Sequence, residues 1–287
     1  MARIKEYPKW SQNHSYLGGG QGLIQVLPMS LGLLIAFLSH PAHNVALYAD
    51  QTVPKRYHGR TILNKPKGFN EKVVALTFDD GPEPLVTPLI LKTLAKEGAK
   101  ATFFVIGSYA KRHPDLVLKA VEEGHVVGSH TWTHKAKRTK KQSGPEIWWT
   151  AKSIHNATGV WPAVFRPPYG IDKAWPAKIA RSEGYPSVLW NKSSADTARN
   201  ATAGSVYWNS ATNIRPGDII LFHDGPGKAH TAKAIPKVIA TYKKHGYEFI
   251  TIPEMLRRWD AFATAQWATK EAKRKKLALQ KPKARSF

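Results

Sequence analysis

A run of apolar residues that ends in two adjacent carboxylates limits most strongly how this chain can fold. Residues 73–78 are long and apolar enough for a buried strand, and Asp79, Asp80, Gly81 and Pro82 follow directly. The strand must end there, because proline lacks a backbone N–H and glycine is a poor residue for a strand interior. Both aspartates therefore lie at the carboxyl end of the strand, where α/β folds place their chemistry. A turn cap is the alternative explanation for the pair.

The composition indicates a globular chain with an anionic partner. Its 287 residues, 42% of them hydrophobic, can hold one large α/β domain or two small ones. The formal net charge of +23 favours nucleic acid, an acidic membrane surface or an anionic wall polymer as the partner. No nucleic acid is expected, because the sequence carries no helix-turn-helix, zinc-finger or RNA-binding signature. The lack of cysteine excludes disulfides and thiolate chemistry.

The first 50 residues predict an N-terminal targeting segment. Basic residues precede an apolar run over 23–38, and small residues suited to cleavage follow it. Polar residues interrupt the run, so a signal peptide is favoured over an uncleaved membrane anchor or a core helix. Either of the first two implies export to the periplasm, the cell wall or the medium.

Short β-rich runs alternate with helical stretches from residue 71 to about residue 259. This alternation predicts an α/β fold with a parallel strand core, namely one catalytic domain built as a distorted, incomplete (β/α)7-type barrel. An open, doubly wound sheet is the alternative. Helices are expected over 85–97 and 114–123, since a glycine follows each. The expected strands cover 73–78, 101–106, 125–129, 164–166, 187–190, 218–222 and 248–252.

The domain is expected to span 71–259, with a linker over 51–70 and a basic tail over 260–287. Residues 270–285 carry eight lysines and arginines against a single acid, Glu271. Such a composition predicts a disordered arm that can bind an anionic wall polymer or membrane surface. A merely solvated terminus explains it equally well.

Two histidines follow the strand expected at 125–129. His130 and His134 are four residues apart, and one helical turn would bring them to the same side. The pair alone is moderate evidence in a chain with 12 histidines. With Asp79 or Asp80 it makes two imidazoles and one carboxylate, a set that binds a catalytic divalent metal and leaves coordination positions open.

Four motifs together resemble a known family. Residues 77–82 (TFDDGP) and 130–134 (HTWTH) resemble the first two motifs of the polysaccharide deacetylases of carbohydrate esterase family 4, the NodB-homology domain. Residues 166–170 (RPPYG) match the third motif and residues 221–224 (LFHD) the fifth. All occur in family order between residues 71 and 259.

The resemblance implies that Asp80, His130 and His134 hold the metal while Asp79 acts as general base. A divalent metal lowers the pKa of bound water, so a carboxylate within hydrogen-bond reach can take its proton. Two histidines and an aspartate suit Zn²⁺ best, and Co²⁺, Ni²⁺ or Mn²⁺ also fit.

The remaining motifs supply the other implied roles. Arg166 is expected to orient Asp79, with a surface cation as the alternative. The backbone N–H of Tyr169 is expected to stabilise the oxyanion, since Pro167 and Pro168 stiffen the loop and have no N–H of their own. His223 is the expected general acid for the leaving amine.

The fourth motif departs from the family pattern. Trp190 and Asp196 fit, and Asp196 is expected to pair with His223, but Ser193 and Thr197 stand where the family often has aspartate and tryptophan. The lost indole predicts an altered wall of the sugar pocket, unless another aromatic fills the space. Candidates for that role are Trp132, Trp190 and Trp208, and the residues expected to contact substrate are Trp190, Leu221 and Pro168.

The predicted function is metal-dependent hydrolysis of N-acetyl groups from amino sugars in a polysaccharide substrate. Peptidoglycan is favoured, because the basic run over 135–141 beside the histidines suits an anionic glycan. Chitin or chitooligosaccharide is the next substrate, followed by acetyl xylan ester. An inactive deacetylase-like protein that binds the wall is the alternative from another functional class.

Overall fold

The computed structural model describes residues 49–280, with side chains up to residue 276. The predicted targeting segment lies almost wholly outside these residues, as does the end of the basic tail. Within the described part, no helix combines the length and hydropathy that a membrane span requires.

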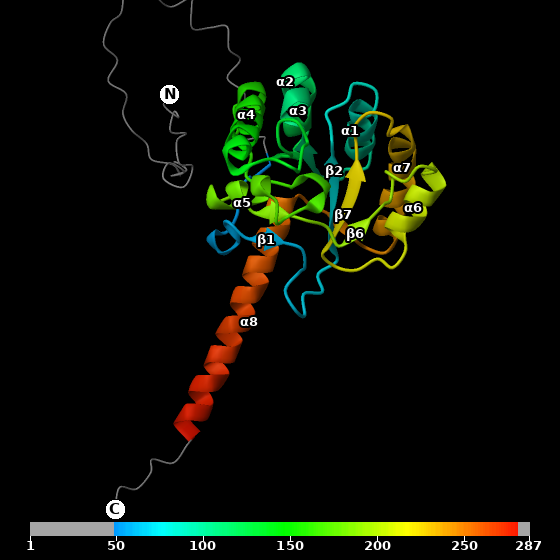
Figure 1. Cartoon of the computed structure of the whole chain (residues 1–287). Helices are drawn as coiled ribbons and strands as arrows, with labels where there is room; N and C mark the ends of the chain where they lie inside the picture. Colours follow the sequence, from blue (N-terminus) through cyan, green and yellow to red (C-terminus); the bar gives the residue numbers. More distant parts are fainter. Residues whose placement is uncertain (1–48, 281–287) are drawn as a thin grey trace, which may run out of the picture.

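A parallel sheet forms the centre of the molecule (Figure 1). Its middle strand, β2, is buried along its whole length, as its apolar sequence predicts. The strands run in the order β4-β3-β2-β7-β6, and β8 pairs with the start of β2. Their bounds are β2 Val73–Asp79, β3 Ala101–Val105, β4 Val126–Ser129, β6 Lys192–Ser193, β7 Asp218–His223 and β8 Glu248–Phe249.

The sheet continues beyond β4 through single bridges. Phe165 pairs in parallel with Ser129 of β4 and with Ser187 of β5. The strand predicted over 164–166 is therefore reduced to one bridging residue. Strand β5 (Ser187–Val188) in turn pairs with β1 (Thr61–Ile62). The predicted fold class, an α/β fold with a parallel strand core, is confirmed.

Helices cover the outside of this sheet (Figure 1). The two helices predicted from sequence correspond to α1 and α3, with slightly shorter bounds. The helices are α1 Thr87–Lys96, α2 Gly107–Arg112, α3 Pro114–Glu122, α4 Lys140–Thr158, α5 Trp175–Ser182, α6 Ala203–Ala211, α7 Ala229–Lys244 and α8 Ile252–Gln280, and short 3₁₀ turns cover Lys55–Tyr57 and Pro168–Gly170.

The alternation of side chains along β2 decides which of them face the candidate site. Leu76 and Phe78 pack outward in a core shared with α1 and α7, and Phe78 stacks on Phe222 with ring centroids 5.6 Å apart. Since successive side chains of a strand point to opposite faces, Thr77 and Asp79 face the other side of the sheet. These two polar residues are buried there, beneath the loops that carry the candidate site.

Helix α8 differs from the predicted tail. It begins inside the fold, where Met255, Leu256 and Trp259 are buried, and it continues outward past the predicted domain boundary (Figure 1). The expectation of a disordered arm is wrong for residues 270–280, which are helical. The predicted linker is also part of the core, because Phe69 packs edge-on against Trp259 and Phe262.

Candidate active site and metal centre

The two adjacent aspartates leave β2 in different directions. Asp79 is the last residue of the strand and lies opposite His223, the last residue of β7, in the parallel register. Asp80 has a φ of 72°, which is in the left-handed region and turns the chain out of the strand. Gly81 must be glycine here, since a Cβ at this position would lie 2.2 Å from the Asp224 carboxylate. The backbone thus gives two equivalent acids separate positions.

Asp80 faces both histidines of the HTWTH motif. Its Oδ1 lies 3.2 Å from Nε2 of His134 and 3.5 Å from Nε2 of His130. The three ligand atoms lie within 4.8 Å of one another. This Oδ1 is buried and has no hydrogen-bond partner. Two nitrogens and an unsatisfied carboxylate oxygen fit a divalent metal ion.

The hydrogen bond made by Nδ1 of His130 determines the protonation state of its Nε2. His130 Nδ1 lies 2.8 Å from the carbonyl oxygen of Arg166, which can only accept, so Nδ1 carries the proton and Nε2 keeps its lone pair. Burial lowers the pKa of His130 to about 3, and the neighbouring Asp80 opposes this only in part. A neutral imidazole with its Nε2 toward Asp80 is the form that coordinates metals.

The histidine motif is a loop and not the helical turn that the spacing suggested, with Thr131 and His134 both at positive φ. Two elements hold it. The N–H groups of Gly107 and Ser108, at the start of α2, donate to the carbonyls of Thr131 and Trp132. The N–H and the hydroxyl of Thr133 donate to the carboxylate of Glu146 in α4, at 2.8 and 2.7 Å. Sequence reasoning missed Glu146, whose only signal was an isolated acid beside a basic run.

Arg166 lies wholly inside the protein beside Asp79, so the surface-cation alternative is excluded. Its Nη1 donates to Asp79 Oδ1 at 2.7 Å and to the hydroxyl of Thr77 at 2.8 Å. Its other nitrogens donate to the carbonyls of Val188 and Leu189. Burial raises the pKa of Asp79, and the charges of Arg166 and His223 offset this only in part. Asp79 is therefore more basic than an ordinary aspartate while its orientation is fixed.

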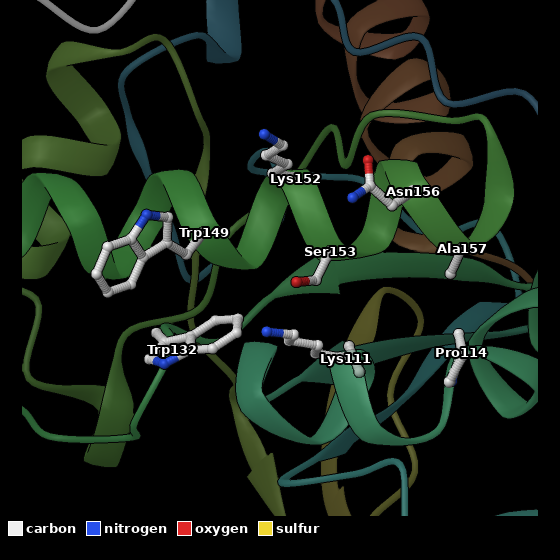
Figure 2. Close-up of a pocket in the computed structure, with 9 residues that line it drawn as sticks. Lys111, Pro114, Trp132, Trp149, Lys152, Ser153, Asn156 and Ala157 are labelled. Atoms are coloured by element: carbon white, nitrogen blue, oxygen red, sulfur yellow. The ribbon is translucent and has the colours of Figure 1, made fainter. Parts of the chain in front are cut away.

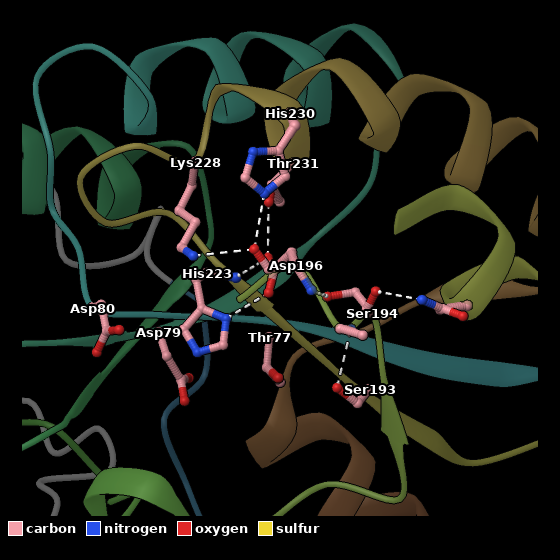
Figure 3. A network of polar contacts seen from close by, with 12 residues as sticks. Thr77, Asp79, Asp80, Ser193, Ser194, Asp196, His223, Lys228, His230 and Thr231 are labelled. Carbon is pink, nitrogen blue, oxygen red and sulfur yellow. Dashed lines mark hydrogen bonds and ion pairs between the residues drawn. The ribbon is translucent and has the colours of Figure 1, made fainter. Parts of the chain in front are cut away.

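His223 and Asp196 form a second buried pair, shown in Figure 3. His223 Nδ1 lies 2.7 Å from Asp196 Oδ1, and Asp196 Oδ2 accepts from the backbone N–H of His223 and from the hydroxyl of Thr231, both at 2.8 Å. Burial acts to lower the pKa of His223, but the hydrogen bond and the carboxylate charges of Asp196 and Asp79 outweigh it and raise the pKa. The same pairing lowers the pKa of Asp196 against the effect of burial.

The fourth motif, despite Ser193 and Thr197, brings Asp196 into contact with His223. Ser193 Oγ accepts a hydrogen bond from the N–H of Ala195, whose φ is 54°, and the chain turns there toward Asp196. Thr197 is exposed to solvent. The backbone carbonyl of Asp196 accepts from Lys228 at 3.1 Å and is 2.8 Å from Nε2 of His230. These α7 contacts, together with Thr231, were not foreseen, because nothing in the α7 sequence marks them.

The RPPYG loop lies beside the metal ligands. Tyr169 has a φ of 59°, and its N–H forms no hydrogen bond with any described residue. Its ring is 68% exposed, with its centroid 4.6 Å from that of His134. Pro168 of the same loop is buried.

The expected pocket-wall residues differ in their accessibility. Trp190 is half-buried against Gly170 of the same loop, where a Cβ would come within 2.7 Å of the indole. Leu221 is buried in β7. Trp208 is 66% exposed on α6, and Trp132 lines a separate groove that is described below.

Asp224, the last residue of the LFHD motif, is a further buried acid beside the site. Its Oδ2 accepts from the Thr87 hydroxyl at 2.6 Å, and its Oδ1 has no partner. Burial raises its pKa to about 7, and the charges of Asp80 and Asp79 act in the same direction. The motif places it behind the site, packed against Gly81.

Comparisons with known proteins agree with this geometry. The family model described as "Polysaccharide deacetylase" matches residues 67–188. A peptidoglycan-N-acetylglucosamine deacetylase of Bacillus cereus is 38% identical over 192 residues, which are 66% of this chain and 90% of the relative. The chain also matches peptidoglycan-N-acetylglucosamine deacetylase PgdA of Listeria monocytogenes, at 32% identity over 89% of its own length, but it spans only about half (53%) of that relative.

A solved structure shows the same fold. The crystal structure of the Bc1960 peptidoglycan N-acetylglucosamine deacetylase superimposes with a TM-score of 0.64 at 32% identity, over 70% of this chain and 94% of that one. Sequence motifs, fold and relatives therefore agree, and the chain belongs to the polysaccharide deacetylase family.

Proposed function

We propose that this chain is a metal-dependent deacetylase that hydrolyses N-acetyl groups of amino sugars in peptidoglycan and releases acetate. The observation that carries the proposal is the convergence of Asp80, His130 and His134 beside two acid-base groups, Asp79 and His223. The relatives named above as peptidoglycan N-acetylglucosamine deacetylases support the choice of substrate.

Asp80, His130 and His134 would hold the metal, with Zn²⁺ as the favoured ion for this set of donors. A divalent ion bound there supplies Lewis acidity, which polarises the acetyl carbonyl and makes water acidic enough to react near neutral pH. The neutral state of His130 and the unpaired oxygen of Asp80 are consistent with this role.

Asp79 would take the proton from the attacking water. Its pKa is raised above that of an ordinary aspartate, and its hydrogen bond with Arg166 holds the carboxylate in place. Hydroxide adds to the acetyl carbon as this proton leaves. The developing oxyanion would accept from the N–H of Tyr169, which has no partner among the described residues.

His223 would supply the proton for the leaving group. Breaking the C–N bond of an amide expels an amine, which leaves readily only when its nitrogen is protonated. The raised pKa keeps His223 charged at higher pH than a free histidine, with Asp196 as its counter-ion. The products are acetate and the free amino sugar. Asp79 takes one proton of the water, and the other is released when the new carboxylic acid ionises. Loss of a proton from Asp79 to solvent and its uptake by His223 restore both groups.

The substrate and location remain part of this proposal. We expect an exported enzyme that works on the cell wall, with basic residues 135–141 and the basic part of α8 favouring an anionic polymer. Chitooligosaccharide and acetylated xylan are the competing substrates. An inactive wall-binding protein is disfavoured, since the three ligand and two acid-base positions are all occupied by suitable residues.

The test is acetate release from purified peptidoglycan, chitooligosaccharides and acetyl xylan, with and without a chelator, beside an Asp79→Asn variant. Activity highest on peptidoglycan, lost with the chelator and in Asp79→Asn, is the expected result. Asp115→Asn, which alters an exposed carboxylate of α3, is the control and should leave activity unchanged. Chelator-insensitive activity, or full activity in Asp79→Asn, would overturn the mechanism, and preference for a neutral glycan would overturn the substrate.

A further inference from the structure

A groove opens between α2 and α4, next to the histidine loop. It has a volume of about 550 Å³, within the range of small-molecule sites. Figure 2 shows the side chains that line it. We define this tryptophan groove by its aromatic, basic and polar residues, which are Lys111, Trp132, Trp149, Lys152, Ser153 and Asn156.

Two indoles form one end of the groove. Trp132 and Trp149 meet edge to face, with centroids 5.9 Å apart. Trp149 is 49% exposed and Trp132 is half-buried. Indoles that are exposed to water do not contribute the free energy of burial to the fold. Their exposure in a concave site therefore favours a ligand with an apolar face, such as a sugar ring.

Positive charge and hydrogen-bonding groups lie beside the indoles. In Figure 2 the Lys111 ammonium points toward Trp132. Lys111 and Lys152 are both exposed, and neither makes an ion pair with a described residue. Ser153 adds a hydroxyl that points toward Lys111, and Asn156 adds an amide that extends from the other edge of α4 (Figure 2). A ring that carries carboxylates and hydroxyls fits this combination better than a neutral apolar ligand does.

The groove and the candidate metal centre share the histidine loop and helix α4. Trp132 lies between His130 and His134 in the sequence, and its carbonyl accepts from Ser108 of α2. Helix α4 holds the same loop through Glu146 and also provides the groove wall from Trp149 onward. From Trp149 to Ala157 this wall runs about 12 Å at the rise of an α-helix. The same loop and the same helix therefore border both the groove and the candidate metal centre.

We propose that the tryptophan groove binds an acidic portion of the glycan substrate outside the reacting sugar. A sugar ring packs on Trp149 and Trp132, and its carboxylate, or that of an attached peptide, pairs with Lys111 and Lys152. This inference rests on the proposed function, in which the glycan is the substrate of the adjoining centre. It explains how a preference for an anionic polymer could reside in residues that take no part in the chemistry.

The test uses two variants with matched controls. Trp149→Ala removes the exposed indole, and a double variant, Lys111→Gln with Lys152→Gln, removes both charges. Trp267→Ala alters a similarly exposed indole on α8, and Lys92→Gln with Lys96→Gln removes two exposed charges from α1. Melting temperatures identify any variant that fails to fold. If Trp149→Ala is such a variant, the double lysine variant still tests whether the groove binds the acidic glycan.

Kinetics would be measured on muramidase-released peptidoglycan fragments that carry free carboxylates and on neutral chitotriose. The groove variants should raise KM about tenfold on the acidic fragments with kcat unchanged, as expected for loss of one aromatic or ionic contact. On chitotriose they should match the wild type, and the controls should match it on both. Equal effects on both glycans, or none on either, would overturn the inference.

Calorimetric binding of the same acidic fragments separates this inference from the proposed function. If the wild type releases no acetate from any glycan but its binding still depends on Trp149 and the lysine pair, the function fails while the groove assignment holds. If acetate release is normal and the groove variants bind as tightly as the wild type, the groove assignment fails alone.

Discussion

Arg166 donates to the Asp79 carboxylate across 2.7 Å in an ion pair that is almost wholly enclosed by protein. Thr77 and two backbone carbonyls accept three more of its N–H groups, so four of the five guanidinium donors are hydrogen-bonded. Removing one partner of such a pair leaves the other charge buried and unpaired, which is far more costly than losing an exposed pair.

Arg166→Gln is therefore expected to lower the free energy of unfolding by about 3–5 kcal/mol. The measurement is urea denaturation at neutral pH. Arg274→Gln, which removes the exposed pair with Glu271, is the control and should change the same quantity by at most about 1 kcal/mol. Equal stability losses in the two variants would show that the Arg166–Asp79 pair has no structural role.

Substitution of the two adjacent aspartates should affect Zn²⁺ binding differently. Asp80→Asn is expected to weaken Zn²⁺ binding by more than about 100-fold, because Asp80 is the carboxylate that faces both histidines. Asp79→Asn should bind Zn²⁺ with nearly wild-type affinity yet lose activity by about 10²–10⁴-fold. Calorimetric titration of chelator-treated protein measures the first quantity and acetate release the second. Loss of the metal in Asp79→Asn and its retention in Asp80→Asn would reverse the assignment.

Much of the site could be predicted because its residues follow strand ends. An apolar run that stops at Asp79 places the carboxylate at the edge of a parallel sheet, and the run that ends at His223 places the imidazole beside it. The resemblance then divided the roles of Asp79 and Asp80, which strand periodicity alone left equivalent. What fixes their directions is the positive φ at Asp80, a property of the backbone that the sequence pattern indicated only through the glycine that follows.

The residues that support the site were less predictable. Glu146 and Thr231 lie on helices, 13 and 35 residues along the chain from the groups they hold, and their contacts depend on how α4 and α7 pack on the sheet. The tail prediction failed for a related reason. Composition predicted disorder for 270–287, but Trp259 and Phe262 anchor α8 against Phe69, and a helix anchored at one end can continue into a basic sequence.

The His223–Asp196 pair gives the activity a predictable dependence on pH. Since the pairing raises the pKa of His223, Asp196→Asn should lower it, leaving burial as the dominant effect. The alkaline limb of the kcat/KM profile should then move to lower pH, because a histidine in the general-acid role proposed for His223 must be protonated to act. An unmoved alkaline limb would exclude His223 as the group that titrates there.

The same pair should make the stability of the protein depend on pH. The contribution of His223 is lost as the pH rises, and that of Asp196 is lost as the pH falls. A raised histidine pKa contributes stability that is complete below the unfolded value of 6.5 and is lost as pH rises through the folded value. The lowered pKa of Asp196 contributes stability above its unfolded value of 3.8, which is lost as pH falls through the folded value. Asp196→Asn should therefore destabilise most between these limits, as measured by melting temperature across pH, and less at alkaline pH.

The basic part of α8 should determine how tightly the protein is retained on an anionic wall polymer. Four of the five cations over 270–276 make no ion pair with a described residue, and Arg274 shares the one nearby acid, Glu271. Each cation near an anionic surface contributes about 1 kcal/mol at most, and salt screens this attraction. In the test variant, glutamine replaces each of these five cations, Lys270, Lys273, Arg274, Lys275 and Lys276.

This variant should leave a column of immobilised phosphodiester wall polymer at clearly lower salt concentration than the wild type, with unchanged turnover of chitotriose. The control removes the same number of exposed charges elsewhere, at Lys92, Lys96, Lys173, Lys233 and Lys244. Because both variants carry the same net charge, a difference between them reports the arrangement of charge on α8. If the two variants elute at the same salt concentration, retention depends on overall charge, and α8 has no specific part in it.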